Sequence, residues 1–203
     1  MLTLYHSPRS RSTRVVRLID ELGALDRVTV EIVTIPRQDG SGGGRDPKNP
    51  HAEGKVPYLV HDGVGIRETN AIMVYLTELF PEAGLGPMPG DAQRGAYLGW
   101  MAYYGNVLEP ALVLQASGIS NPMTQATFRD MAAVTARLTE ALEHGPYLLG
   151  ETYSAADILL ASPFVWFPQA MPDVPAIRDW VARVQDRPSV QRTEAFDTRA
   201  VAA

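Results

Sequence analysis

Three serines gather near the start of the sequence, in the segment SPRSRST that runs from Ser7 to Thr13. A helical pattern begins directly after them, so their hydroxyls stand where a side chain can cap a helix. A hydroxyl in the same place can instead donate a hydrogen bond to a ligand. The segment is therefore a candidate catalytic loop, and both roles stay open for Ser10 and Ser12.

Cysteine is absent from the 203 residues of the chain. Its absence excludes disulfides, protein thiolates and cysteine-ligated metals. The four histidines are scattered and show neither an HExxH motif nor a pair four residues apart, so we expect no metal site. Any thiol chemistry must use a thiol that a ligand brings.

A proline stands at the start of an apolar strand pattern in KVPYLVHDG, Lys55–Gly63. Proline cannot donate a hydrogen bond to a sheet, so it occurs at edges, first positions or bulges. One interpretation is that pairing within the sheet stops here, so that the backbone next to Pro57 can pair with an extended ligand. The other is that Pro57 is an ordinary trans proline at the start of an edge strand.

Glu68, Thr69 and Asn70 stand where a strand pattern ends and a helical pattern begins. Free N–H groups and the positive end of the helix dipole gather at such a point, which makes it an anion site. Thr69 can also serve simply as the N-cap of the helix. Both roles can hold together, because the cap geometry exposes the N–H groups.

The N-terminal part of the chain alternates between strand and helix patterns. A segment rich in glycine, proline and charge, residues 36–54, is expected to form a long loop. The patterns predict, in chain order, a strand, a helix, a strand, a hairpin and a helix, at Leu2–Tyr5, Thr13–Gly23, Val28–Val33, Asp62–Gly63 and Thr69–Phe80.

The C-terminal part shows helix patterns only, at residues 91–117, 124–144, 154–171 and 175–185. Pro163 should kink or break the third of these helices. We therefore expect a small α/β domain over residues 1–82, a linker over 83–90 and an all-helical domain over 91–203.

The charge balance excludes several classes of function. A net charge of -5 argues against a nucleic-acid partner, because phosphates are bound by clustered lysine and arginine. No apolar run approaches the ~20 residues of a transmembrane helix, and no signal peptide is visible. We expect a cytoplasmic protein without a nucleic-acid or membrane partner.

A small α/β domain whose third strand begins with proline has the pattern of the thioredoxin-like fold. Followed by an all-helical domain, it resembles the glutathione S-transferase family, in particular bacterial, cysteine-free members with a serine-type active-site loop. The resemblance covers nearly the whole chain and implies an α/β thioredoxin-like domain plus an all-α helical bundle domain. It rests on five segments in order: SPRSRSTRVVRL, NPHAEGKVPYLV, RETNAIMVYLTELFP, GETYSAADILLA and DRPSVQR.

The resemblance implies that the Ser7–Thr13 loop activates the thiol of glutathione. Aligning Arg14–Arg17 with the family's helix start puts Ser10 at the position that faces the sulfur in serine-type transferases. Its hydroxyl would donate a hydrogen bond to the sulfur and favour the thiolate. The family often has a proline shortly after this serine, where this chain has Arg11 and Ser12. A shift of one residue would promote Ser12, or place Arg11 where cysteine-type members keep their cysteine.

The resemblance also implies how glutathione, the co-substrate, is held. The Val56–Pro57 bond would be cis, and the Val56 backbone would pair with the cysteinyl part of glutathione. Glu68 would pair with the α-amino group, and Thr69 would bind the γ-glutamyl carboxylate. Lys55 would contact the glycyl carboxylate.

In the second domain, Tyr103 and Tyr104 fall where the family lines its electrophile pocket. Ser154 and Asp157 form a capping box before an apolar run, which we assign to folding. Other positions are expected to be structural: Arg14 and Arg17 on a solvated helix face, Trp166 and Phe167 in the core, and Asn49 and His51 as supports of their loop.

Together these inferences predict a cytoplasmic, homodimeric glutathione transferase for detoxification. It would activate the glutathione thiol and conjugate it to a small hydrophobic electrophile without a metal. Two alternatives stay open: a glutathione-dependent isomerase or dehalogenase on the same scaffold, and a noncatalytic glutathione-transferase-like module for binding or regulation.

Overall fold

The computed structural model describes residues 1–37, 40 and 43–202. Its N-terminal part is built on a four-stranded mixed sheet with the strand order β2-β1-β3-β4. Strand β1 pairs parallel to β2 and antiparallel to β3, and β3 pairs antiparallel to β4. The strands are β1 (Leu2–His6), β2 (Thr29–Ile32), β3 (Tyr58–His61) and β4 (Val64–Ile66), which confirms the expected strands and hairpin.

The turn between β3 and β4 shows why the dipeptide Asp62-Gly63 predicts a hairpin. Both residues have positive φ, 48° and 85°, as a type I′ turn requires and as this residue pair tolerates. The loop expected over residues 36–54 includes 38–39 and 41–42, which lie outside the described residues. Its described remainder consists of irregular backbone with turns and bends and an isolated bridge at Gly43.

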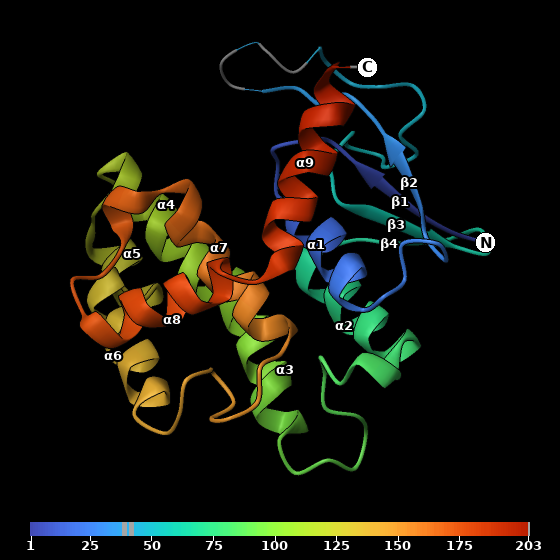
Figure 1. Cartoon of the computed structure of the whole chain (residues 1–203). Helices are drawn as coiled ribbons and strands as arrows, with labels where there is room; N and C mark the ends of the chain where they lie inside the picture. The colour runs from blue at the N-terminus through green and yellow to red at the C-terminus, as the bar shows by residue number, and fades with distance from the viewer. Residues whose placement is uncertain (38–39, 41–42, 203) are drawn as a thin grey trace. The chain divides into compact units, whose positions relative to one another are not determined.

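Two helices, α1 (Thr13–Glu21) and α2 (Thr69–Leu79), lie beside the sheet (Figure 1). Leu18 and Ile19 of α1 are fully buried, as their helical spacing predicts. Burying each such side chain contributes about 1.5–3 kcal/mol to folding. Helix α2 ends before Pro81, which cannot continue it and instead opens the short helix η1 (Pro81–Ala83).

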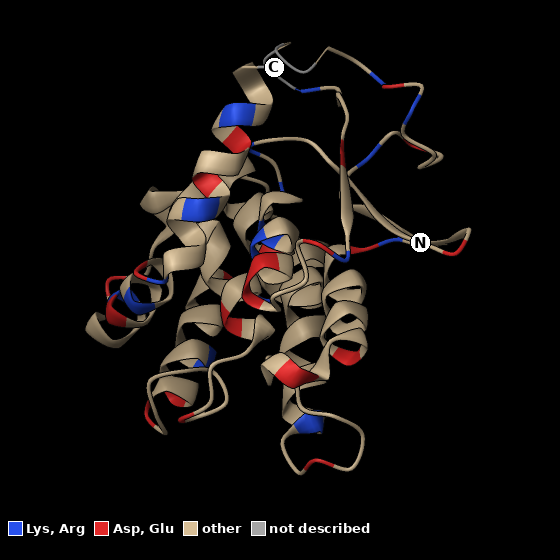
Figure 2. Cartoon of the chain, turned by 45° about the vertical axis from the view of Figure 1, so that its right-hand side comes forward, with Lys and Arg blue, Asp and Glu red and all other residues tan. Residues whose placement is uncertain are grey.

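The last helix, α9 (Pro188–Ala202), is an element that the sequence patterns do not predict. It packs on α1, and its acidic residues lie between basic residues nearer its two ends (Figure 2). Ser189 donates a hydrogen bond to the buried carboxylate of Glu21 at 2.6 Å. Arg192 pairs with Asp20 at 2.7 Å. Polar contacts therefore join α9 to the second half of α1.

This packing corrects one expectation. Arg14 and Arg17, expected on a solvated helix face, are only 7% and 6% exposed. The Arg17 guanidinium donates to Glu21 at 3.1 Å and to Ser189 of α9 at 3.3 Å. The helix face is buried because a helix from the far end of the chain covers it.

The second part of the chain is all helical, as expected. Its central helix α7 is buried on every side from Ala155 to Phe164, as in the core helix of a bundle. The elements are α3 (Arg94–Tyr103), the π-helical turn η2 (Tyr104–Leu108), α4 (Glu109–Ser117), α5 (Pro122–Thr127), α6 (Met131–Leu142), α7 (Ala155–Trp166), η3 (Pro168–Ala170) and α8 (Pro175–Gln185).

Details of these helices differ from the expected pattern. Residues 124–144 form two helices, because Phe128 is extended and Asp130 starts α6 by accepting a hydrogen bond from the Ala133 N–H at 2.9 Å. Helix α7 continues past Pro163 for three residues. Its end is open to solvent: Trp166 and Phe167, expected in the core, are 45% and 48% exposed.

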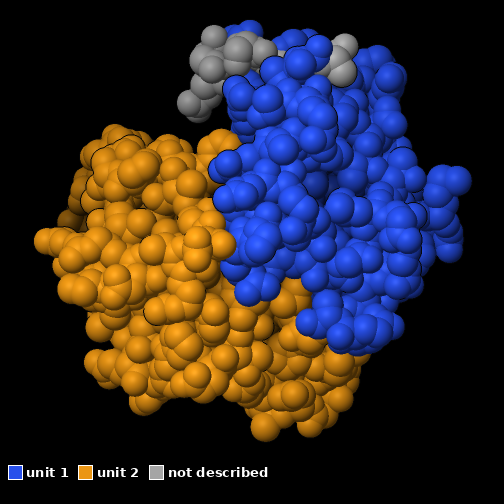
Figure 3. All heavy atoms as spheres, viewed as in Figure 1, with its two compact units in different colours: residues 1–83, 187–203 blue, residues 84–186 orange. Residues whose placement is uncertain are grey.

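The chain divides into two compact units (Figure 3), residues 1–83 with 187–203 and residues 84–186. The expected division placed residues 91–203 in one helical domain, whereas in the structure the C-terminal helix groups with the N-terminal unit. Within the described residues, none of the helices has both the length and the apolar character that crossing a membrane needs.

Candidate active site

The Ser7–Thr13 segment forms a loop between β1 and α1, and its two candidate hydroxyls differ in exposure. Ser12 has no exposed surface, whereas Ser10 is half-buried. Ser10 Oγ lies 2.7 Å from the Ser7 carbonyl oxygen and 2.8 Å from Ser12 Oγ. Arg11 between them is exposed. Of the two serines, Ser10 is the one with surface open to a ligand.

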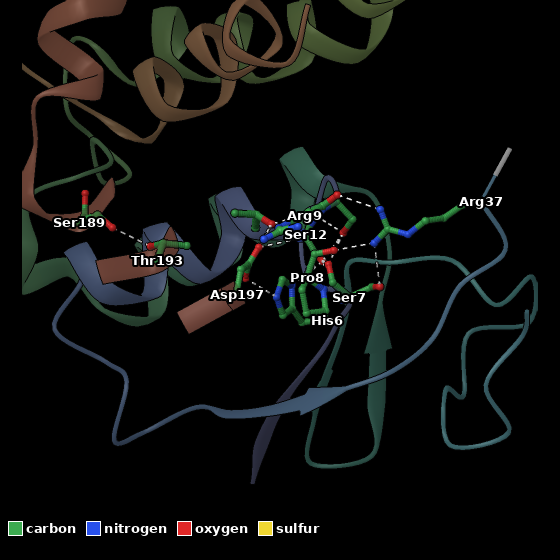
Figure 4. Close-up of polar contacts among 11 residues, drawn as sticks. His6, Ser7, Pro8, Arg9, Ser12, Arg37, Ser189, Thr193 and Asp197 are labelled. Atoms are coloured by element: carbon green, nitrogen blue, oxygen red, sulfur yellow. Dashed lines mark hydrogen bonds and ion pairs between the residues drawn. The ribbon is translucent and has the colours of Figure 1, made fainter. Parts of the chain in front are cut away.

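A buried histidine and a buried carboxylate hold Ser12 in place (Figure 4). Ser12 Oγ lies 2.6 Å from His6 Nδ1, and His6 Nε2 lies 2.9 Å from Asp197 Oδ1. His6 is fully buried and Asp197 is 3% exposed. Because His6 ends β1 and Asp197 lies on α9, this chain of contacts fixes the loop to the C-terminal helix.

The other oxygen of Asp197 binds the loop directly. It accepts hydrogen bonds from the Arg9 N–H at 2.6 Å and from the Thr13 hydroxyl at 2.7 Å. Arg9 has a φ of 54°, which is uncommon for a residue other than glycine. Burial raises the pKa of Asp197, but the hydrogen bonds from His6, Arg9 and Thr13 lower it by more, so the pKa lies below its ordinary value. Asp197 is therefore a carboxylate at neutral pH.

Arg37, which follows β2, binds the outer side of the loop (Figure 4). Its guanidinium donates to the Pro8 carbonyl oxygen at 2.6 Å and to the Arg9 carbonyl oxygen at 3.2 Å. It also lies 3.5 Å from Ser7 Oγ. The loop is therefore held by a carboxylate through the Arg9 N–H and the Thr13 hydroxyl, and by a cation through two backbone carbonyls.

The loop shares one end of the sheet with the other predicted ligand segments. Continuing the register of β1 with β3 sets His6 opposite Pro57, and continuing that of β3 with β4 sets Pro57 opposite Glu68. The carboxyl ends of β1 and β4 and the amino end of β3 therefore meet. The topology thus brings together the three segments that the sequence singles out.

The Val56–Pro57 peptide bond is cis, as expected. Within the described residues, neither the Val56 N–H nor its carbonyl has a backbone partner. Lys55 is exposed, and its carbonyl accepts a hydrogen bond from the Asn49 side chain at 3.1 Å. His51 is buried and its N–H donates to Asn49 at 3.0 Å. Asn49 and His51 support the loop that carries Lys55 and Val56, which agrees with a structural role.

Glu68 and Thr69 stand at the start of α2. Glu68 is the N-cap residue, with an exposed side chain and a φ of 65°. The expectation that Thr69 is the N-cap is wrong, because Thr69 is the first residue inside the helix. The first hydrogen bond of the helix runs from the Ile72 N–H to the Glu68 carbonyl at 2.9 Å. The Thr69 N–H therefore precedes the helical ladder, where an anion can bind.

Tyr103 and Tyr104 belong to the second unit, at the junction of α3 and η2. Tyr104 is buried and Tyr103 is half-buried, with its ring 5.5 Å from that of Trp100. The Tyr103 hydroxyl is buried and has no hydrogen-bond partner within the described residues. Burial raises its pKa, against the opposing effect of two arginines, so the hydroxyl is neutral near pH 7.

Ser154 and Asp157 form the expected capping box at the start of α7. One oxygen of Asp157 accepts the Ser154 N–H at 2.9 Å. The other accepts the Leu148 N–H at 3.0 Å and the Trp180 indole N–H at 2.9 Å. Burial raises the pKa of Asp157, and these hydrogen bonds oppose that effect. The carboxylate thus joins three segments of the second unit, which agrees with a role in folding.

Within the described part of the chain, no group of three or more histidine and acidic side chains is placed to hold a metal ion. The histidine and the carboxylate nearest to the candidate loop, His6 and Asp197, are bonded to each other instead.

Two family models match the sequence in the order that the structure shows. The model described as the glutathione S-transferase N-terminal domain matches residues 4–84, and the model described as the C-terminal domain matches residues 106–188. The chain belongs to the glutathione S-transferase family.

Solved structures and curated relatives agree with this membership. A glutathione transferase from Methylococcus capsulatus superposes with a TM-score of 0.77 at 26% identity, covering 98% of this chain and 99% of that one. A glutathione transferase homologue from Sulfitobacter, solved with bound glutathione, gives 0.69 at 26% identity, covering 97% and 98%. The disulfide-bond oxidoreductase YfcG of Escherichia coli is 26% identical, covering 93% of this chain and 92% of its own length.

Sequence reasoning missed three residues around the loop of this family member: His6, Arg37 and Asp197. His6 follows a strand pattern and Arg37 lies in a loop, and neither belongs to a motif. Asp197 lies 191 residues from His6, in a helix whose own residues give no sign of a partner. No local signal in a single sequence could have found these contacts.

Proposed function

We propose that this glutathione S-transferase activates the thiol of glutathione through the hydroxyl of Ser10 and conjugates the sulfur to a small hydrophobic electrophile. One observation carries the choice of Ser10 over its neighbour: Ser10 is half-buried at the edge of the loop, whereas Ser12 is wholly buried against His6. A hydroxyl that donates to the sulfur would stabilise the thiolate without becoming a nucleophile itself.

The rest of glutathione would extend along the end of the sheet. The Val56 backbone would pair with the cysteinyl part, and the exposed side chain of Lys55 would contact the glycyl carboxylate. At the start of α2, the Thr69 N–H and hydroxyl would bind the γ-glutamyl carboxylate and Glu68 the α-amino group. The support for this placement is that strand register brings these segments to the end of β1 where the loop begins.

The proposal extends to the second unit and to assembly. Tyr103, with a neutral hydroxyl that has no partner within the described residues, would line the electrophile pocket and donate to a polar group of the substrate. Tyr104 is buried and would contribute mainly to the shape of the pocket. We expect a cytoplasmic homodimer, and sedimentation equilibrium would measure the oligomeric state.

The decisive test of the proposed function is Ser10→Ala. Loss of the hydroxyl should raise the pKa of bound glutathione, seen as a basic shift in the ultraviolet absorbance of the thiolate and in the pH dependence of kcat. A hydrogen bond to a charged group contributes about 1.5–3 kcal/mol, so we expect a shift of roughly one to two units. Glutathione affinity should change little, because this contact matters for the ionised sulfur.

Arg11→Ala is the matched control, because Arg11 is the exposed neighbour that a shift of register would bring to the sulfur. It should leave the thiolate pKa near that of the wild type. A shift in Arg11→Ala and none in Ser10→Ala would move the role to Arg11 and contradict the proposal.

The alternatives differ in what happens after binding. A glutathione-dependent isomerase or dehalogenase would turn over its own substrate but not a generic aromatic electrophile. A noncatalytic module would be retained on immobilised glutathione without any turnover. Protein-thiol exchange of the oxidoreductase type needs a protein thiolate, which a chain without cysteine cannot supply. Retention on glutathione together with conjugation of an aromatic electrophile would support the transferase.

A further inference from the structure

We propose that Asp197, His6, Ser12 and Ser10 form a relay that takes up the proton of the glutathione thiol. The inference rests on the proposed function, because Ser10 must face the sulfur. Asp197 and His6 touch no substrate in this scheme, so they are positioning residues that act through the two hydroxyls. Figure 4 shows the contacts that lead from Asp197 on α9 to His6 and Ser12.

The carboxylate at one end fixes the direction of the first two hydrogen bonds. An ionised carboxylate only accepts, so His6 Nε2, which lies 2.9 Å from Asp197 Oδ1, donates to it. In the proposed resting state this is the only proton on the ring nitrogens. His6 Nδ1 is then a lone-pair acceptor. Ser12 Oγ, at 2.6 Å, must therefore donate its hydrogen to Nδ1.

Counting donors and acceptors in the same way fixes the direction in which the Ser10 hydroxyl donates. Because Ser12 has used its one hydrogen, its oxygen can only accept, from the Ser7 N–H at 3.2 Å and from Ser10 Oγ at 2.8 Å. Ser10 donates either to Ser12 or to the Ser7 carbonyl oxygen at 2.7 Å, and accepts the Ser12 N–H at 3.2 Å. Its hydrogen points into the loop, and one lone pair is left for an incoming donor.

A thiol placed against Ser10 would thus meet an acceptor first. The thiol proton moves to Ser10 Oγ, the Ser10 hydrogen moves to Ser12 Oγ, and the Ser12 hydrogen moves to His6 Nδ1. The S–H bond and two O–H bonds break, two O–H bonds and one N–H bond form, and the S–H electron pair stays on sulfur. The chain then runs in reverse: His6 donates to Ser12, Ser12 to Ser10, and Ser10 to the thiolate.

The transfer changes no net charge. Before it, Asp197 carries the one negative charge; afterwards Asp197 pairs with the His6 imidazolium and the negative charge is on sulfur. Asp197 is the charged side chain hydrogen-bonded to His6 within the described residues. Phe196, next to Asp197 in the chain, places its ring 6.0 Å from the His6 ring. Arg9 and Thr13 contact Asp197 through an N–H and a hydroxyl. A buried imidazolium with a hydrogen-bonded carboxylate avoids the cost of an unpaired charge.

Asp197→Asn is the informative variant, because the loop fixes which way the new amide points. The Arg9 N–H, 2.6 Å from Asp197 Oδ2, is a donor only. The asparagine must keep its oxygen there and turn its NH₂ toward His6. His6 Nε2 then has to accept, the ring proton moves to Nδ1, and Ser12 can no longer donate to it. The relay loses its acceptor, while the hydrogen bonds from Arg9 and Thr13 of the loop to residue 197 remain.

The first measurement is the imidazole nitrogen chemical shifts of His6 in the full-length protein by NMR. We expect the Nε2–H tautomer in the free wild type and the imidazolium with glutathione bound. S-methylglutathione has no thiol proton, so His6 should stay neutral with it. Asp197→Asn should show the Nδ1–H tautomer and stay neutral with either ligand. If this variant does not fold, the comparison of the two ligands in the wild type still shows whether His6 takes up the thiol proton.

The second measurement is the pH dependence of turnover. Loss of a positioned proton acceptor costs roughly 10²–10⁴-fold in rate, so Asp197→Asn should lower kcat by at least about 10²-fold with little change in the KM for glutathione. Asp20→Asn is the matched control, since it weakens another contact between α1 and α9, the pair with Arg192, and should keep the wild-type profile. An equal loss in Asp20→Asn would assign the effect to the docking of α9 and overturn the relay.

The remaining outcomes separate the two proposals. Glutathione bound as a thiolate beside a neutral His6 would overturn the relay and leave the proposed function standing. An Nδ1–H tautomer in the free wild type would also overturn the relay alone. A wild type that binds no glutathione would overturn the proposed function, and the relay with it.

Discussion

Two buried aspartates, Asp157 in the second unit and Asp197 on α9, have similar hydrogen-bonding environments but belong to networks that lead to different parts of the molecule. Both are carboxylates with almost no exposed surface, and both accept hydrogen bonds through each oxygen. The donors to Asp157 are two backbone N–H groups, the Ser154 hydroxyl and the Trp180 indole, so this network ends in the core.

The network around Asp197 continues instead toward solvent. From Asp197 it passes through His6 and Ser12 and reaches Ser10, which is half-buried. The difference lies in what the exchangeable donor leads to. His6 can exchange donor and acceptor roles and connects Asp197 to Ser12, whereas the Ser154 hydroxyl beside Asp157 leads only to the Ala156 N–H, which cannot accept. A buried carboxylate therefore serves folding where its network ends in fixed donors, and can serve chemistry where exchangeable groups continue it.

The largest expected effect is that of Asp157→Ala on stability. It leaves the Leu148 N–H, the Ser154 N–H and the Trp180 indole without their acceptor in the core, at about 1–3 kcal/mol for each buried group. Because three such groups lose their acceptor, we expect a total loss of about 3 kcal/mol or more by urea unfolding. The thiolate pKa of bound glutathione, measured well below the melting temperature, should not change. A shifted thiolate pKa would show that Asp157 also influences the site.

A smaller loss of stability, with a distinctive pH dependence, is expected for Asp197→Asn. The hydrogen bonds from His6, Arg9 and Thr13 lose their charged acceptor, but each group keeps a neutral amide partner. We therefore expect a loss of stability of about 1.5–3 kcal/mol, the contribution of one hydrogen bond to a charged group. The folded pKa of Asp197 lies below the ordinary value of 3.8, so between these two values the unfolded chain binds more protons and wild-type stability rises with pH. The contribution is complete above the unfolded pKa and is lost as pH falls through the folded pKa.

Unfolding of the wild type and of Asp197→Asn should therefore be compared from neutral to acid pH. The difference in unfolding free energy should be constant near neutrality and shrink once pH falls below about 4. A difference that stays constant down to acid pH would mean that the charge of Asp197 contributes nothing to stability.

The same comparison explains what the sequence could predict. Ser154 and Asp157 are three residues apart, and a capping box is a local pattern with its own spacing, so it was visible without a structure. The strands, the hairpin at Asp62-Gly63 and the cis Pro57 were also predictable, from local patterns or from the family resemblance. The break at Asp130 was missed because a helical apolar pattern does not reveal a cap inside it.

Contacts between residues far apart in the sequence could not be predicted, because no local pattern marks them. The pairing of His6 with Asp197 depends on where α9 docks, and nothing in a single sequence couples residues so far apart. The burial of Arg17 was missed for the same cause, since its partner Ser189 also lies on α9. The exposure of Ser10 against the burial of Ser12 depends on how the loop folds over His6, so the sequence left their order open.

The smallest expected effect is that of Ser154→Ala, and it measures how much of the Asp157 network is capping alone. The Ser154 hydroxyl lies 3.3 Å from the Ala156 N–H and 3.2 Å from Asp157 Oδ2, both long distances. The Ser154 N–H still donates to Asp157 at 2.9 Å in the variant. A lost cap costs about 0.5–2 kcal/mol, and we expect the lower half of this range by urea unfolding, with Ser154→Thr close to the wild type. A loss as large as that of Asp157→Ala would mean that the hydroxyl, and not the carboxylate, organises the start of α7, and the contrast between the two aspartates would no longer hold.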